Sequence, residues 1–88
     1  NTFKGGKSMD LHCVEKGVQL KVVFNEKGVK FFNILGFPEK TVVVAGKDKG
    51  CRSKRTIING FFLGSSLNNE IGFYFEDDEN ILSFEIKE

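Results

Sequence analysis

Residues 18–24 read VQLKVVF, and over the first five positions apolar residues alternate with polar ones. Alternation at a period of two is typical of a β-strand that buries one face. Gln19 and Lys21 are expected on the outer face of this strand. The inner face is expected to hold four apolar residues: Val18, Leu20, Val22 and Phe24. The stretch therefore predicts a strand of a β-fold, and the neighbouring segments are interpreted outward from it.

Apolar stretches on either side predict the adjacent strands. Residues 9–14 are predicted as a first strand, and residues 25–28 (NEKG) as a tight turn with Gly28 at the positive φ of a bulge-type hairpin. Residues 29–35 then return antiparallel with apolar side chains on both faces, so this strand is either covered on both sides or lies at a barrel seam. Residues 41–45 (TVVVA) form a continuous β-branched run, which is typical of a buried central strand.

The second half of the chain continues the pattern of short strands. Residues 56–63 (TIINGFFL) fit either one strand or a hairpin with Asn59 and Gly60 as a type I′ turn. We favour the hairpin because Asn-Gly between paired apolar residues is a strong hairpin signal. Residues 71–76 alternate as a strand and residues 77–80 form a turn. The last strand is expected to place Leu82, Phe84 and Ile86 inward.

Composition points to the same fold class. The 88 residues include ten Phe, ten Gly, one Pro and only one Ala, and no window shows a helical apolar period of useful length. We therefore expect an all-β fold, a small six- to eight-stranded antiparallel β-sandwich or barrel. Residues 1–8 are expected to be a flexible N-terminal segment and residues 9–88 a single domain, with 70–88 as an extra C-terminal hairpin.

Cys13 and Cys51 are the two cysteines of the chain and stand 38 positions apart. In a short chain with a thin core, such a pair suits one disulfide in an oxidising compartment, which would stabilise the fold by roughly 3–4 kcal/mol. The alternative is two buried free thiols in a cytosolic protein. The chain starts at Asn1, as a mature exported chain would after signal-peptide removal, and no apolar run is long enough to span a bilayer. These features predict a secreted protein that does not enter the membrane.

No pattern in the sequence predicts an active site. His12 is the only histidine and is interpreted as an exposed strand residue, and one His with two distant Cys cannot build a closed zinc site. The acidic residues 76–79 lack the register of a calcium loop and are interpreted as a solvated turn. The glycines form no phosphate-binding motif. We expect a protein that is not an enzyme and needs no cofactor or metal.

Charge is uneven along the chain and indicates where a partner would bind. Residues 1–69 carry an excess of seven positive charges and residues 70–88 an excess of six negative ones, so the net charge is only +1 and nucleic-acid binding is disfavoured. The loop at residues 46–55 is expected to attract an acidic partner, or else to be a solvated loop. Its five cations are Lys47, Lys49, Arg52, Lys54 and Arg55.

A free strand edge is the second predicted binding surface. An edge binds a partner by accepting an added strand, and the strand at 18–24, with Gln19 and Lys21, is the candidate. Lysine on that strand is equally consistent with simple protection of the edge. Phe37, Phe62 and Tyr74 are candidates for exposed aromatic contacts, although packing at the core or its rim is favoured.

The two cysteines also carry a resemblance to a known family. Cys13 closes the first predicted strand, and Cys51 lies between the fourth and fifth in the stretch KDKGC at 47–51. This arrangement over residues 9–63 resembles the MAX effectors, avirulence and ToxB-like proteins secreted by plant-pathogenic fungi. The resemblance implies a six-stranded β-sandwich and a non-enzymatic virulence factor that binds a host protein, either a small heavy-metal-associated domain or a plant immune receptor. A monomer is expected.

Two other functions remain open. The stretch LHCV at 11–14 followed by a hairpin is similar to the opening of the bacterial periplasmic lysozyme inhibitors, but their Ser-Gly-x-x-Tyr loop is replaced here by Gly64-Ser65-Ser66-Leu67. The third possibility is a phage or cytoplasmic regulator with reduced thiols. Among these, the sequence favours a secreted effector that binds a host protein through strand edges or the basic loop.

Overall fold

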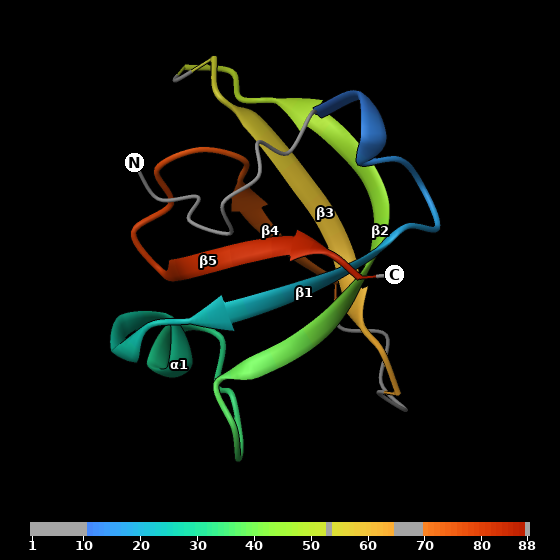
Figure 1. The fold of residues 1–88 in the computed structure, drawn as a ribbon. Coiled ribbons are helices and arrows are strands. Elements are labelled where there is room, and N and C mark those ends of the chain that lie inside the picture. Colours follow the sequence, from blue (N-terminus) through green and yellow to red (C-terminus); the bar gives the residue numbers. More distant parts are fainter. Residues whose placement is uncertain (1–10, 53, 65–69, 88) are drawn as a thin grey trace.

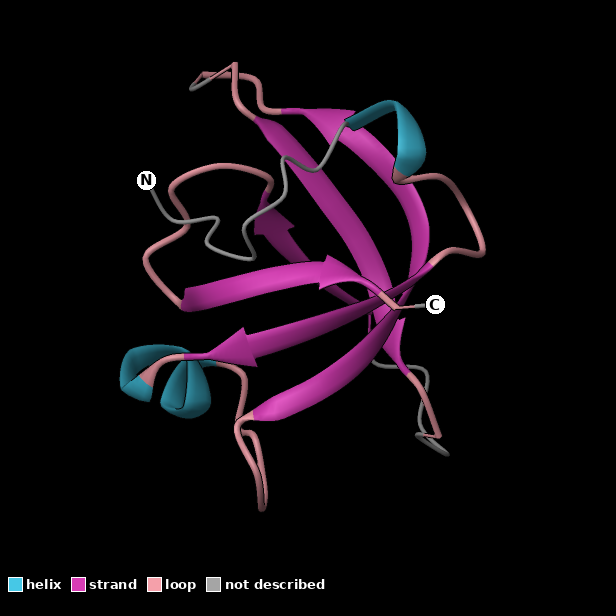
Figure 2. Ribbon diagram, viewed as in Figure 1, coloured by secondary structure: helices cyan, strands magenta, loops and turns pink. Residues whose placement is uncertain are grey.

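Antiparallel strands in one curled, open sheet make up most of the described chain (Figures 1 and 2). The computed structural model describes residues 11–52, 54–64 and 70–87, with the side chain of His12 excepted. The strands are β1 (Gln19–Phe24), β2 (Glu39–Lys49), β3 (Thr56–Phe62), β4 (Glu70–Tyr74) and β5 (Ile81–Ile86). Their order in the sheet is β4-β3-β2-β1-β5. The predicted fold class is confirmed as nearly all-β, but the described residues form five strands in a single sheet rather than six to eight.

β1 lies between β2 and the edge strand β5 and behaves as its alternating sequence predicts. Leu20 and Val22 are fully buried and Phe24 is 2% exposed. Phe73 from β4 and Phe84 from β5 meet across the core, with ring centroids 5.5 Å apart. Because β4 and β5 are the two ends of the strand order, this contact requires the sheet to curl, as Figure 1 shows.

A short helix, α1 (Glu26–Phe31), replaces the predicted turn at 25–28 and the start of the predicted strand at 29–35, so that prediction is wrong. Asn25 caps the helix: its Oδ1 accepts a hydrogen bond from the Gly28 amide at 2.8 Å. Glu26 in the first turn and Lys30 in the last both complement the helix dipole. Gly28 is not at positive φ and is buried within the helix.

The N-terminal strand prediction for residues 9–14 is also wrong where the structure describes it. Leu11–Cys13 form a 3-10 helix, and the Val14 amide donates to the Leu11 carbonyl at 3.1 Å. Val14 itself is fully buried. Residues 9 and 10, like the predicted flexible segment at 1–8, lie outside the described residues.

β2 and β3 are longer than the sequence patterns indicated. β2 continues through Gly46 to Lys49, across a register shift between Val44 and Gly46. The connection to β3 is therefore shorter than the loop predicted at 46–55 and begins only after Lys49. β3 runs without a turn through Asn59 and Gly60, so the favoured hairpin is wrong and the single-strand alternative is confirmed.

The C-terminal strands β4 and β5 do not pair as the extra hairpin that was expected. β4 pairs with β3 and β5 pairs with β1, which places them at opposite edges of the sheet. Since every neighbouring pair is antiparallel, β4 and β5 run in the same direction. A register shift between Val23 and Phe24 accompanies the burial of Ile81, and Leu82, predicted inward, is 59% exposed.

Cys13 and Cys51 are free and exposed, so the predicted disulfide is wrong. Cys13 ends the 3-10 helix and Cys51 lies in the turn between β2 and β3. Backbone hydrogen bonds close this turn without a crosslink: the Gly50 amide donates to the Arg55 carbonyl at 2.9 Å and the Lys54 amide to the Gly50 carbonyl at 3.2 Å. The alternative of buried thiols does not hold either, because both side chains reach solvent.

Candidate protein-binding surfaces

The end of the β2–β3 hairpin carries four exposed cations, Lys47, Lys49, Arg52 and Lys54, which we call the basic hairpin. Lys47 and Lys49 are two positions apart on β2. The Lys47 Nζ donates to the Leu11 carbonyl at 3.1 Å, which joins the hairpin to the 3-10 helix. Asp48, the acid between them, accepts a hydrogen bond from Asn59 Nδ2 at 2.8 Å. Four of the five predicted basic-loop residues therefore lie on one exposed hairpin.

Arg55, the fifth predicted cation, is held by the loop between β4 and β5. Its Nη2 donates to the Glu76 carbonyl at 2.8 Å and to the Asp77 carbonyl at 2.5 Å. The guanidinium carbon also lies 4.0 Å from the centroid of the Tyr74 ring, a cation–π contact. Arg55 thus joins the start of β3 to the β4–β5 loop, and its guanidinium is held against Tyr74 and the carbonyls of that loop.

Gln19 and Lys21 do not lie on a sheet edge, because β1 is hydrogen-bonded to β2 on one side and to β5 on the other. The Lys21 ammonium makes a 3.3 Å ion pair with Glu85, the residue directly opposite it on β5. The edges of the described sheet are β4 and β5. Binding by strand addition would have to use one of those two strands.

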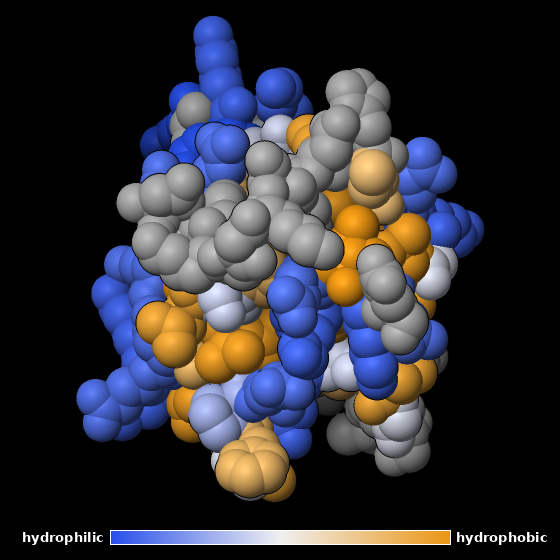
Figure 3. Space-filling view, viewed as in Figure 1, coloured by the Kyte–Doolittle hydropathy of each residue, from blue (hydrophilic) through white to orange (hydrophobic). Residues whose placement is uncertain are grey.

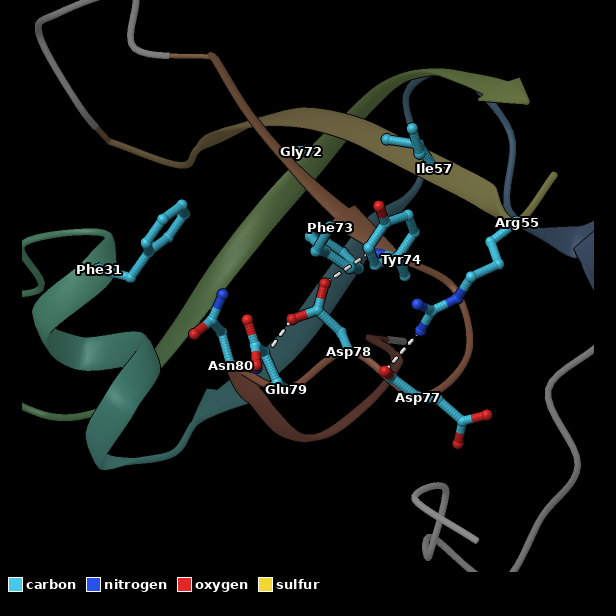
Figure 4. Close-up of a pocket in the computed structure, with 10 residues that line it drawn as sticks. All are labelled: Phe31, Arg55, Ile57, Gly72, Phe73, Tyr74, Asp77, Asp78, Glu79 and Asn80. Atoms are coloured by element: carbon cyan, nitrogen blue, oxygen red, sulfur yellow. Dashed lines mark hydrogen bonds between the residues drawn. The ribbon is translucent and has the colours of Figure 1, made fainter. Parts of the chain in front are cut away.

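A groove of about 530 Å³ lies beside β4. Figure 4 shows Phe31 of α1 on one side and Tyr74, Arg55 and Asp77 on the other, with the β4–β5 loop between them. The remaining lining residues are Ile57, Gly72, Phe73, Asp78, Glu79 and Asn80. The groove therefore adjoins the open side of an edge strand.

Asp78 organises the loop that borders the groove. Its Oδ2 accepts a hydrogen bond from the Tyr74 amide at 2.7 Å, and its Oδ1 accepts one from the Asn80 amide at 2.8 Å. Asn80 is 8% exposed, and its side-chain oxygen is buried without a hydrogen-bond partner. This oxygen is buried and unpaired, whereas both carboxylate oxygens of Asp78 in the same loop accept hydrogen bonds.

Glu79 and Lys27 connect the loop to α1 on its outer side. Their Oε1 and Nζ atoms are 2.7 Å apart. The hydrogen bond from the Lys27 ammonium and its charge lower the pKa of the Glu79 carboxyl, and desolvation opposes this only weakly. Asn25 Nδ2 also donates to the Glu79 carbonyl at 2.8 Å. The helix and the loop are thus linked at several points.

Three large hydrophobic side chains are exposed around the C-terminal end of α1. Phe31 is 70% exposed, Leu35 is 77% exposed and Phe37 is 82% exposed. Figure 3 shows orange side chains interrupting the blue surface at the lower end of the molecule, where Figure 1 places α1 and the following loop. Of the aromatic candidates from the sequence, Phe37 is exposed, while Phe62 and Tyr74 are half-buried.

The sequence did not indicate Phe31 and Leu35 as surface residues, because residues 29–35 were predicted as a strand. The signal available in the sequence was that the apolar residues of this stretch fall on both faces of a strand, so that a single buried face could not hold them all. Groups of His, Cys, Asp and Glu able to hold a metal ion do not occur among the described residues. None of the helices in the described residues is long and apolar enough to cross a membrane.

Comparison with known proteins identifies no relative: no family model matches the chain, and neither a curated protein nor a solved structure matches it.

Proposed function

We propose that this chain is a non-enzymatic protein-binding domain that contacts an acidic surface of its partner with the basic hairpin. The observation that carries the proposal is the exposure of Lys47, Lys49, Arg52 and Lys54 on a single hairpin whose turn is closed by backbone hydrogen bonds. Cations on an ordered support lose less conformational freedom on binding than cations on a mobile loop.

The charge distribution supports a local electrostatic contact. The chain has a net charge of only +1, so general attraction to polyanions is weak, whereas the basic hairpin concentrates positive charge at one end of β2 and β3. Complementary charge of this kind raises association rates and selects the partner.

A role for this binding in a host is proposed only from the resemblance to the MAX effectors. In that form, the domain is secreted and binds a host protein as a virulence effector. The predicted disulfide, which supported both export and the resemblance, is not formed. The effector role therefore now depends on the fold class and on the exposed basic hairpin alone.

A second candidate function is a binding module that works in a reducing compartment. Exposed free thiols at Cys13 and Cys51 favour it, because an oxidising compartment promotes disulfide formation at such positions. The lysozyme-inhibitor alternative has no comparable observation in its favour. Inhibition of lysozyme by the purified domain would revive it.

The binding proposal is tested by charge reversal with a matched control. The variant Lys49→Glu/Arg52→Glu changes two exposed cations of the basic hairpin. The control, Lys40→Glu/Lys87→Glu, changes net charge equally. Lys40 is the second residue of β2, at the end far from the basic hairpin, and the Lys87 Nζ lies near Thr41 at that same end. Affinity purification from host extract and from the cytosol of the producing cell, quantified by mass spectrometry, compares both with the unmodified domain.

We expect the hairpin variant to lose partners that the control retains, and we expect capture of those partners to fall as salt is raised. Partners that come only from host extract support the effector role, and partners that come only from the cytosol support the second function. Equal capture by both charge variants would remove the basic hairpin from the mechanism.

A further inference from the structure

We infer that the open edge of β4 captures an extended, basic segment of a partner protein by strand addition. This surface adjoins the basic hairpin, because Arg55 and Asp77 also line a second hollow with Lys49 and Lys54. It binds through the backbone of β4 rather than through those cations, so the inference goes beyond the proposed function, and the experiment below distinguishes the two.

The hydrogen bonds of β4 show which of its backbone groups are open. The Phe75 amide donates to the Thr56 carbonyl on the β3 side, at 2.9 Å. The preceding Tyr74 amide points the other way, where it donates to Asp78 Oδ2. Because successive residues of a strand alternate in direction, the amide and carbonyl of Gly72 face outward as well. These groups are the hydrogen-bonding pair that an added strand would use.

Asp78 limits where an added strand can pair. Its carboxylate accepts the hydrogen bond of the Tyr74 amide, as the carbonyl of a neighbouring strand would. The nearest other amide of β4 that faces outward is therefore that of Gly72. Gly72 is exposed and carries no side chain, so a neighbouring backbone can approach closely. The occupant is therefore expected to pair at Gly72 and to end near Tyr74.

The groove beside this edge supplies room for the side chains of the occupant. Ile57 and Tyr74, directly opposite each other on β3 and β4, flank Gly72 on the outer face of the sheet. Phe31 faces them across the groove and is 70% exposed. An apolar side chain of an added strand could pack between these groups.

Charge identifies the occupant as basic. The lining of the groove contains three carboxylates, Asp77, Asp78 and Glu79, and one cation, Arg55. The Arg55 guanidinium is already bound to the Glu76 and Asp77 carbonyls. The Asp77 carboxylate has no hydrogen-bond or ion-pair partner among the described residues, and Figure 4 shows it at the Tyr74 end of the groove, pointing away from Phe31. Lysine or arginine in the occupant would pair with it.

The test uses synthetic peptides and one pair of variants at a single position. Fluorescein-labelled, terminally blocked peptides of alternating Lys and Val, or Glu and Val, are titrated with the domain and followed by fluorescence anisotropy. Gly72→Pro removes the outward amide without removing a β3 hydrogen bond, because that amide faces away from β3. Gly72→Ala also adds a Cβ, 3.1 Å from Asn59 Oδ1, but keeps the amide.

We expect the Lys–Val peptide to bind, to bind Gly72→Pro about tenfold more weakly and to bind Gly72→Ala within about twofold of the unmodified domain. The Glu–Val peptide should bind about tenfold more weakly than the Lys–Val peptide. Absence of Lys–Val binding, or equal losses in the two Gly72 variants, would overturn strand addition. Equal binding of both peptides would overturn the basic character of the occupant.

Two further variants keep the test decisive if Gly72→Pro does not fold. Asp77→Asn removes the free carboxylate and suits the positive φ of 58° at that position. Phe31→Ala removes an exposed side chain of the groove wall. Each should weaken Lys–Val binding by about fivefold, and no change in either variant would place the peptide elsewhere. Lys49→Glu/Arg52→Glu should not weaken this binding, because it removes positive charge near Asp77, and this separates it from the proposed function of the basic hairpin.

Discussion

Gly28, inside α1, packs directly against the backbone carbonyl of Asn80 in the β4–β5 loop. A Cβ at position 28 would overlap that carbonyl oxygen and lie 3.1 Å from the Asn80 Cβ. The Asn25 amide donates to the same carbonyl at 3.2 Å. The helix therefore rests on a loop more than fifty positions away in the sequence, and that loop also borders the groove beside β4.

Gly28→Ala is expected to destabilise the domain by about 2–3 kcal/mol, because the added methyl meets a backbone atom that cannot move aside easily. A loss of stability would be informative, because Ala in the interior of a helix is otherwise about 1 kcal/mol more stabilising than Gly. Urea unfolding followed by circular dichroism measures the difference.

Gly46→Ala is the matched control, because a Cβ there meets no atom of the described structure within 4 Å. Its free energy of unfolding should stay within about 0.5 kcal/mol of the unmodified domain. A destabilisation as large as that of Gly28→Ala would show that the helix–loop contact is not what makes position 28 special.

Gly60→Ala is expected to destabilise the domain by about 2–3 kcal/mol as well, for the same kind of reason in the sheet. A Cβ at position 60 would lie 2.5 Å from the Val43 carbonyl oxygen and 2.7 Å from Val42 Cγ1. Thermal unfolding is the measurement. If residue 60 were instead at a hairpin turn, the loss would come from its φ, and Gly60→Asn would largely restore stability; in a continuous β3 it should not.

The local pattern was sufficient to predict β1 and insufficient to predict α1. In β1, alternation of side chains sets the buried face directly, and Leu20, Val22 and Phe24 are buried as expected. The residues at 25–28 suit both a hairpin turn and a helix cap, because Asn and Gly favour both. The deciding contacts are non-local: Asn25 Nδ2 donates to the Glu79 carbonyl, and Gly28 packs against Asn80.

The candidate surfaces divide in the same way. The basic hairpin could be predicted because the charges of Lys47, Lys49, Arg52 and Lys54 are adjacent in sequence. The role of Arg55 could not, since its partners are carbonyls on a distant loop. The groove beside β4 is lined by residues of α1, β3, β4 and the β4–β5 loop, which are distant in sequence. It exists only because β5 pairs with β1 and not with β4, which the local sequence does not reveal.

Arg55→Lys is expected to lower stability by about 1–2 kcal/mol, because a lysine cannot reach two carbonyls in the fixed geometry of a guanidinium or stack equally on Tyr74. Arg52→Lys, at an exposed position three residues earlier, should have an effect close to zero. Thermal unfolding of both variants at one pH is the comparison. Equal melting temperatures would show that the contacts of Arg55 with the loop contribute nothing measurable.

Cys13 and Cys51 are expected to react with iodoacetamide in the folded protein without reductant, adding two alkyl groups to the intact mass. Cys13→Ser should change the free energy of unfolding by less than about 0.5 kcal/mol, because the exposed thiol supports no crosslink. Material should be prepared from an oxidising compartment and, separately, from a reducing one. A mass two hydrogens lower with no alkylation in the first preparation would restore the disulfide and the argument for export.

Glu79 is expected to titrate below its ordinary pKa, with Lys27 as the cause. Because the pKa of the folded state is depressed, the contribution of this pair is present above the pKa of the unfolded chain and is lost as the pH falls through the folded value. The side chains are 64% and 71% exposed, so the effect on stability is small and the titration itself is the better measurement. Carbon-detected NMR of the Glu79 carboxyl should show its midpoint rising in Lys27→Met and staying in place in Lys30→Met. An unchanged midpoint in Lys27→Met would mean that the link between α1 and the β4–β5 loop is made by Asn25 and Gly28 alone.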